Sequence, residues 1–415
     1  MSLPLGKAEK DLHGTENQPH EDLDPALRAE RNRILEASRD GDIDVLREIA
    51  ISPGGFYSDN LRSKAWPALL GFNGEITSLN SPGGLHDGWM RLPRHRDEDQ
   101  VKLDVDRSFV YYPNDESPEE LEKKKVELSD LICQTLREQP YLCYFQGYHD
   151  ICQVILLVLP KPMRPLAMAR LSTLRIRDFM LPTLGPAIAQ LRLIPDILRA
   201  ADPELCAHVL SSSSQNNNNN NSNKNNSEPY FALSDTLTMF AHNVQRYSDI
   251  ARLFDALLAR GPVFALYVVA RVVLRRRAEL LALDPDEPDV LHFVLSKLPA
   301  DLDLDAVVAE AALLFDAHPP ETLSSWQGIS RNSVLKSTRK VKDLGVQSLK
   351  DGERMFEAQV REMRRAEQRR KLMLLAWRNR ALIAAVLVGV SAVCLRKTPA
   401  WAGIIEWVTT RLSRS

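Results

Sequence analysis

Apolar residues recur along most of this chain at intervals of three and four, which is the spacing of one face of an α-helix. The stretch that begins at Leu23, "LDPALRAERNRILEASRDGDIDVLREIA", follows this spacing and is interrupted only by "DGD". Alternating runs rich in Val, Thr and Tyr, which would indicate strands, are missing, and no Asn-Gly or Asp-Gly turn joins two such runs. The pattern predicts an all-α fold of many helices.

Charge and cysteine content narrow the classes of function. The net charge of the 415 residues is −2, so no overall positive field favours nucleic acid as a partner. The five cysteines are scattered, without the paired spacing of a zinc site, and they are expected to be reduced thiols of a cytosolic domain. Residues 1–22 are polar and lack the apolar region of a secretory signal, so we expect a disordered N-terminus.

Composition divides the rest of the chain. A helical domain is expected over residues 23–320, with its core at 55–320. A run of Ser and Asn at 211–227 cannot bury apolar area, which predicts a disordered insertion in a surface loop; an assembly tract is the alternative. Residues 321–346 are predicted to be a linker, and 347–380 a charged helix with a basic end.

The most apolar segment of the chain is "ALIAAVLVGVSAVCL", residues 381–395. It is shorter than the usual span of about 20 residues, but Arg380, Arg396 and Lys397 flank it and can reach the headgroups on either side. The prediction is a transmembrane tail anchor, and a buried helix of the soluble domain is the alternative. More Arg and Lys precede the segment than follow it, which places the preceding domain in the cytosol. Residues 396–415 would form a lumenal or interfacial tail, or return into the membrane as half of a hairpin.

Two short stretches carry possible chemistry. In "VKLDVDRSFVYYP", a helix would align Val101, Val105, Phe109 and Tyr112 on one apolar face and leave Arg107 off it, within reach of Asp104 three residues earlier. Taken alone, this is most simply a solvated Arg in an exposed ion pair. The other stretch, "YLCYFQGYHDI" at 141–151, concentrates aromatic residues around a Gln, a Gly, a His and an Asp, and taken alone it is most simply a packed start of a helix.

Together these stretches resemble the TBC domain family, the GTPase-activating proteins for Rab GTPases, over residues 55–320. Three motifs occur in the family's order: R-x-x-x-W-x-x-L-L-G from Arg62 to Gly71, I-x-x-D-x-x-R from Val101 to Arg107 with Val for Ile, and Y-x-Q-G from Tyr144 to Gly147. The resemblance implies a multi-helix TBC domain.

The resemblance also implies how such a domain acts. Arg107 would stabilise the charge that builds up on the transferring phosphoryl group, and Gln146 would orient the attacking water. Asp104, Tyr144 and Gly147 would support these two groups. Trp66 and Asp150 would contact the partner. That partner is a Rab in its GTP-bound form, which binds GTP and Mg²⁺ itself, so the chain needs no cofactor. It would be a GTPase activator and not itself a hydrolase.

Several longer stretches resemble a tail-anchored member of this family that resides in the endoplasmic reticulum. They include "AISPGGFYSDNLRSKAWPALLG", "RIRDFM" at Arg175–Met180 and "FALS" at Phe231. The resemblance implies a single-pass protein of the endoplasmic reticulum membrane, with its catalytic domain in the cytosol, that acts on a Rab of the endoplasmic reticulum-to-Golgi step.

Two alternatives and three departures from the family pattern remain. The chain could be a catalytically silent, membrane-tethered Rab-binding scaffold. It could also be a metal-dependent phosphohydrolase built on the His149-Asp150 pair, although the other histidines are scattered. Besides Val101, the departures are Asp106, which could weaken the field of Arg107, and Asp235, which stands where a large apolar residue is expected and could contact the Rab or solvent.

Overall fold

The computed structural model describes residues 25–72, 87–114, 116–213, 228–284 and 287–396. Within these ranges the regular structure is helical and no strand occurs, which confirms the all-α prediction. The chain divides into two compact units, Met1–Glu357 and Ala358–Ser415. The predictions for residues 1–22, for 214–227 and for the tail beyond 396 lie outside the described residues. Residues 211–213, predicted to begin the insertion, instead end a helix.

The described α-helices before residue 214 are α2 (Pro25–Asp40), α3 (Ile43–Ile51), α4 (Asp59–Leu69), α6 (Glu98–Val105), α7 (Pro118–Glu138), α8 (Tyr148–Val158), α9 (Arg164–Arg170), α10 (Gly185–Leu191), α11 (Leu193–Ala201) and α12 (Pro203–Ser213). Of these, α4 and α6 carry the first two motifs, and α8 directly follows the third. Short 3₁₀ helices lie at Asp87–Arg91, Lys161–Met163 and Arg177–Met180, and a π-helical turn at Leu171–Arg175.

The remaining helices of the chain follow residue 228. They are α13 (Leu233–Leu237), α14 (Tyr247–Ala259), α15 (Phe264–Arg275), α16 (Arg277–Leu281), α17 (Pro288–Leu295), α18 (Leu304–Ala317), α19 (Val334–Ser337), α20 (Lys342–Val346), α21 (Leu349–Arg378) and α22 (Arg380–Arg396). Further 3₁₀ helices lie at Tyr230–Ala232, Pro320–Thr322 and Ser324–Gly328.

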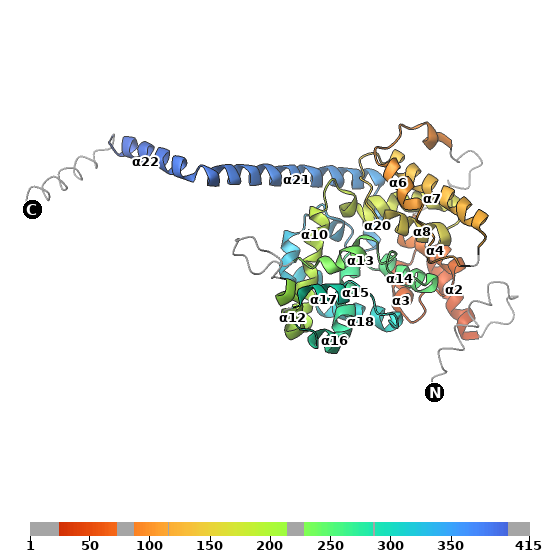
Figure 1. Ribbon diagram of the computed structural model, residues 1–415. Helices are drawn as coiled ribbons and strands as arrows, with labels where there is room; N and C mark the ends of the chain where they lie inside the picture. The colour runs from red at the N-terminus through yellow and green to blue at the C-terminus, as the bar shows by residue number, and fades with distance from the viewer. Residues whose placement is uncertain (1–24, 73–86, 115, 214–227, 285–286, 397–415) are drawn as a thin grey trace, which may run out of the picture. The chain divides into compact units, whose positions relative to one another are not determined.

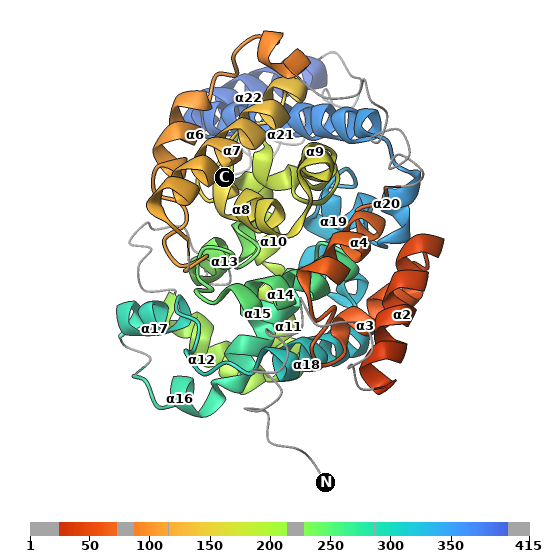
Figure 2. The same ribbon diagram turned by 90° about the vertical axis from the view of Figure 1, so that its right-hand side faces the viewer.

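The core of unit 1 forms around α14 and α15, whose residues are buried on almost every side. α15 packs against α18 and α11, and α14 packs against α3, α4 and α18. A second group consists of α7 with α6, α8 and α9, and α8 joins it to α4 and α14 (Figures 1 and 2). Helix α8 therefore ties both groups together, and its N-terminal end follows directly on the Y-x-Q-G motif.

The R-x-x-x-W motif is explained by a buried carboxylate on α14. Arg62 and Trp66 stand one turn apart on α4, and both donate to Asp255: Arg62 Nε over 3.1 Å and Trp66 Nε1 over 2.8 Å. The backbone N–H of Phe56 donates to the same carboxylate over 3.1 Å. Gly71, with φ of +78°, follows the end of α4, because a left-handed residue there is easiest for Gly.

The segment 321–346 is not a linker. It contributes buried apolar side chains to unit 1 and is held by α19 and α20; those side chains are Leu323, Trp326, Ile329, Val334, Leu335, Val341 and Leu344. Its Ser, Thr and Lys content suggested an exposed tether, but the apolar residues between them supply the packing face. The start of α21 also belongs to unit 1, since Phe356 packs on Tyr141 with ring centroids 5.0 Å apart. The predicted charged helix begins at Leu349, close to its expected start.

Unit 2 contains the end of α21 and the predicted anchor, which lies within α22, a helix of 17 residues. Leu382, Val386, Leu387 and Val388 are exposed apolar side chains on it. Within the described part of the chain, no single helix is long and apolar enough to cross a membrane. Helices α21 and α22, bent by 76° at their junction, meet the length and composition requirements only as a pair.

Candidate functional site

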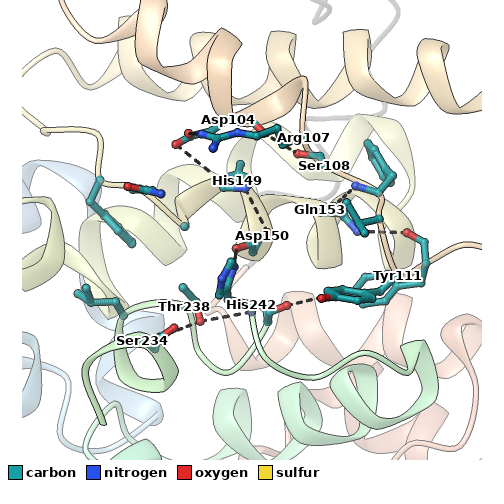
Figure 3. Close-up of a pocket in the computed structure, with 18 of the residues that line it drawn as sticks. Asp104, Arg107, Ser108, Tyr111, His149, Asp150, Gln153, Ser234, Thr238 and His242 are labelled. Carbon is teal, nitrogen blue, oxygen red and sulfur yellow. Dashed lines mark hydrogen bonds and ion pairs between the residues drawn. The ribbon is translucent and has the colours of Figure 1, made fainter. Parts of the chain in front are cut away.

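A pocket of about 500 Å³ opens between the segment after α6, the start of α8, and α13 with the turn that follows it (Figure 3). Phe145, Gln146 and Gly147 come to it from the Y-x-Q-G motif, and Asp104 and Arg107 from the other fingerprint. The wall is completed by residues 108–112, by the first turns of α8 at His149, Asp150 and Gln153, by Leu184, and by Ser234, Leu237, Thr238, Ala241 and His242.

Arg107 lies in the turn after α6 rather than within a helix, because α6 ends at Val105. Its side chain is 67% exposed, while that of Asp104 is fully buried, and Arg107 Nη2 donates to Asp104 Oδ1 over 2.8 Å. Arg107 Nε also donates to the carbonyl of Leu103 over 3.2 Å. The expected contact with Asp104 is present, and it anchors one edge of the guanidinium while the rest faces the pocket. Asp106 is exposed.

Gln146 is exposed at the edge of the same pocket. The structure shows no hydrogen bond from its amide to any residue in the described ranges, so both amide groups are available to water or a ligand. Gly147 follows it with φ of +97°, in the left-handed region that favours Gly. A Cβ on Gly147 would lie 2.6 Å from Thr238 Cγ2, so this position also requires a residue without a side chain.

Tyr144 connects the two motifs. Its hydroxyl donates to Asp104 Oδ2 over 2.9 Å, and its backbone N–H donates to Asp97 over 2.9 Å. Its ring meets that of Tyr148 edge-on at 5.9 Å. Burial raises the pKa of the Tyr144 hydroxyl above its ordinary value, so the group keeps its proton and acts as a donor. Tyr144 therefore fixes the segment before Gln146 to the carboxylate that holds Arg107.

Gln153 is a residue of the pocket that the sequence did not indicate. It is buried on α8 and holds the loop after Arg107: its Oε1 accepts from the N–H of Phe109 over 3.1 Å, and its Nε2 donates to the carbonyl of Tyr112 over 3.2 Å. The predicted helical stripe through Phe109 and Tyr112 is wrong, because these bonds draw the backbone into a loop in which Phe109 has φ of +63°. A lone Gln in the apolar run "ICQVILLVL" was the available signal.

His149, Asp150 and His242 form a polar group across the pocket (Figure 3). His149 Nε2 lies 3.2 Å from Asp150 Oδ1, and His242 Nδ1 lies 2.9 Å from Asp150 Oδ2. The hydrogen bond with Asp150 raises the pKa of His242. In the described part of the chain, no set of three or more His, Cys, Asp or Glu side chains is arranged to hold a metal ion. The His149-Asp150 pair thus gains no further ligands there.

Two expectations about the partner surface are corrected by burial. Trp66 was expected to touch a partner, but it is fully buried, so its role is to bind Asp255 inside the domain. Asp235 was expected at the interface or in solvent. It is 5% exposed and accepts from Asn243 Nδ2 over 2.7 Å. Asp150 lines the pocket, and its partner-binding role stays a prediction.

Burial of Asp235 predicts a pH-dependent stability. Burial raises the pKa of this carboxyl to about 6, so the folded chain holds the proton more tightly than the unfolded one. The stability it contributes is present below pH 4 and is lost as pH rises through 6, by about 3 kcal/mol for two pKa units. Asp235→Asn keeps the acceptor for Asn243 and should raise the free energy of unfolding at pH 7.5 by about 1–3 kcal/mol.

Chemical denaturation at pH 4.5 and pH 7.5 tests this expectation for Asp235. The gain from the substitution should be clearly larger at the higher pH, because only part of the stability has been lost at pH 4.5. Asp301→Asn, at an exposed Asp, serves as the control and should change stability equally little at both values. An equal effect of Asp235→Asn at the two pH values would contradict the raised pKa.

Comparisons with known proteins show which proteins this chain is similar to. Residues 59–281 match the sequence model of the Rab-GTPase-TBC domain family. Human TBC1 domain family member 20 is 32% identical over 351 residues, which cover 84% of this chain and 82% of the human protein. GTPase-activating protein gyp10 of Schizosaccharomyces pombe is 32% identical over 320 residues, covering 74% and 78%. The crystal structure of the Ypt/Rab-GAP domain of Gyp1p has the same fold, with a TM-score of 0.50 and 13% identity over 70% of this chain and 97% of that domain.

Proposed function

The chain belongs to the Rab-GTPase-TBC domain family, and we propose that it accelerates GTP hydrolysis by a Rab by supplying Arg107 and Gln146 in trans. The observation that carries this proposal is the placement of both side chains on one pocket, although 39 positions separate them in the sequence (107 to 146). One is an anchored but largely exposed guanidinium, and the other is an exposed amide without an internal partner. The pocket thus presents the two groups to which the proposed mechanism gives a role.

The proposed mechanism assigns each group one task. In GTP hydrolysis, negative charge is spread over the oxygens of the transferring phosphoryl group, and a donated Arg is worth about 10³–10⁵ in rate. Arg107 suits this task because a guanidinium is always charged and donates to two oxygens at once. Gln146 can accept from the attacking water and donate to a phosphate oxygen through the same amide. Asp104 and Tyr144 hold the segment of Arg107 and the segment of Gln146 in fixed positions relative to each other.

The partner in this proposal is the GTP-bound form of a Rab, which brings its own nucleotide and Mg²⁺, so the chain contributes no cofactor. The proposal extends to a Rab of the endoplasmic reticulum-to-Golgi pathway and a role in vesicle trafficking, which is what the resemblance of the longer sequence stretches implies. The apolar segment 381–395 supports a single-pass anchor in the endoplasmic reticulum membrane with the catalytic domain in the cytosol. The second candidate is a membrane-tethered scaffold that binds a Rab without accelerating its GTP hydrolysis. It is favoured only if Arg107 and Gln146 make no contribution to hydrolysis.

Single-turnover GTP hydrolysis by a panel of GTP-loaded Rabs, with and without the full chain in detergent, tests the proposal. One or more Rabs should be accelerated by orders of magnitude. For a Rab that responds, Gln146→Ala should slow hydrolysis by about 10²–10³, the usual cost of losing one group positioned for the transition state. Because Gln146 makes no internal bond, thermal stability should not change.

Gln327→Ala is the matched control, since Gln327 is exposed and lies outside the pocket. It should leave the rate unchanged. If the wild-type chain binds a GTP-loaded Rab and accelerates none, the scaffold replaces the activator. If a Rab is accelerated equally by wild type and by Gln146→Ala, the role of Gln146 is wrong while the activity stands.

A further inference from the structure

His149 lies between the two segments that carry Arg107 and Gln146. It is in the first turn of α8, three residues after Gln146, and its side chain is 10% exposed. On one side its Nδ1 is 3.3 Å from the Tyr144 hydroxyl and 3.8 Å from Asp104 Oδ2. On the other side its Nε2 is 3.2 Å from Asp150 Oδ1 (Figure 3). One imidazole thus spans the gap between two acidic side chains on different elements.

The Asp104 carboxylate is the junction on the first side. Although fully buried, it accepts from Arg107 Nη2, from Gln100 Nε2 over 3.0 Å and from the Tyr144 hydroxyl. A buried carboxylate needs several donors to offset its lost hydration, so its position depends on each of them. The Tyr144 hydroxyl has one proton and two nearby acceptors, Asp104 and His149, so its orientation depends on both.

Proton accounting decides which bonds His149 makes. Burial lowers the pKa of His149, and the carboxylates of Asp150 and Asp104 act in the opposite direction, while His242 and Arg107 lower it. The neutral ring has one proton. That proton belongs on Nε2, which faces a carboxylate oxygen of Asp150. Nδ1 is then an acceptor that shares the single Tyr144 proton with Asp104 Oδ2, in a three-centre bond with distances of 3.3 Å to Nδ1 and 2.9 Å to Oδ2. The ring therefore donates on one side and accepts on the other.

We propose that His149 is a positioning residue for GTP hydrolysis: by bonding to Tyr144 and to Asp150, it keeps the Asp104–Arg107 unit and the start of α8 after Gln146 in one fixed arrangement. This inference rests on the proposed function. His149 does not contact Arg107 or Gln146 directly. It acts through Tyr144 and Asp104 on one side and through α8 on the other. Loss of the ring should therefore lower kcat and leave KM for the Rab nearly unchanged.

Two substitutions separate the bonds of the ring. In His149→Gln, the amide nitrogen takes the place of Nε2, so the bond to Asp150 is kept and the one to Tyr144 is lost. In His149→Asn, the shorter amide takes the place of Nδ1 and keeps only Tyr144. His149→Leu removes both. We expect kcat to fall about 10–100-fold for Leu, since misplacement by about 1 Å costs up to 10², and by less for Asn and Gln.

The measurement uses the full chain in detergent and the GTP-loaded Rab that the wild type accelerates most. His292→Gln, at an exposed His on α17, is the control and should behave as wild type. Tyr144→Phe completes a double-mutant cycle. If His149 acts through the Tyr144 hydroxyl, adding His149→Gln to Tyr144→Phe should lower kcat by less than twofold further, because the bond is already absent. Losses that multiply would contradict the coupling.

The outcomes separate this inference from the proposed function. If the wild type accelerates no Rab, the function fails and the inference falls with it. If the wild type is active and His149→Leu has wild-type kcat, the function stands and the inference is wrong. A rise in KM at unchanged kcat would likewise overturn it, because His149 would then belong to the docking surface.

Discussion

Arg107→Ala should reduce the acceleration of GTP hydrolysis by about 10³–10⁵, which corresponds to about 4–7 kcal/mol of transition-state stabilisation. Within the described residues, the Arg107 guanidinium donates to Asp104 and to the carbonyl of Leu103. Its removal takes one donor from the buried Asp104 carboxylate, which keeps Gln100 and Tyr144 as donors, so the loss of stability should be about 1–3 kcal/mol. The substitution should therefore abolish activity while the chain stays folded, with only a moderate fall in the thermal unfolding temperature.

Two further variants sharpen this test. Arg107→Lys keeps a positive charge but loses the two-pronged donor, so most of the acceleration should still be lost. Arg331→Ala removes an exposed Arg outside the pocket and should leave the rate unchanged. Binding of the GTP-loaded Rab should persist in Arg107→Ala. If hydrolysis proceeds at the wild-type rate in Arg107→Ala, the charge comes from another residue and Arg107 is only a surface ion-pair partner.

The residues of the candidate site that belong to short sequence motifs were predictable. Asp104 and Arg107 share one motif, and Tyr144, Gln146 and Gly147 share another, so residues close in sequence pointed to both halves. What the sequence could not supply was the link between the halves, the bond from Tyr144 to Asp104, which joins positions 40 apart. Gln153 and His242 were not predicted for the same reason: each forms a hydrogen bond with a residue that only the fold brings near.

The fold followed a similar division. Helical spacing predicted the all-α class and the break between α2 and α3, because these depend on neighbours within a few residues. The end of α6 at Val105 was not predicted, because it depends on hydrogen bonds between Gln153 and the backbone of the next segment, at Phe109 and Tyr112. The role of segment 321–346 was also missed. Its buried residues pack within unit 1, where partners distant in the sequence hold it. One of them is Asp178, which accepts from the N–H of Val334 over 3.2 Å.

Asp255 is the position where one substitution should most damage the fold. It is fully buried, and Arg62, Trp66 and the backbone of Phe56 all donate to it. Asp255→Ala would leave the Arg62 guanidinium, itself 7% exposed, with only the partly exposed Asp59, 3.1 Å away, as an acidic partner. Breaking a buried ion pair by removing one member costs about 3–5 kcal/mol. We expect the free energy of unfolding to fall by that amount, which chemical denaturation of the full chain would measure.

The cost should come mainly from the stranded charge, and a second substitution tests this. Arg62→Met in the Asp255→Ala background removes the unpaired guanidinium, so part of the lost stability should return although another native side chain is gone. Asp249→Ala on the same helix is the control, because its pair with Arg246 is 65% exposed on the Arg side and is worth at most about 1 kcal/mol. If Arg62→Met deepens the loss instead, then packing around Trp66, rather than charge pairing, is what Asp255 maintains, and the R-x-x-x-W motif would be a packing motif.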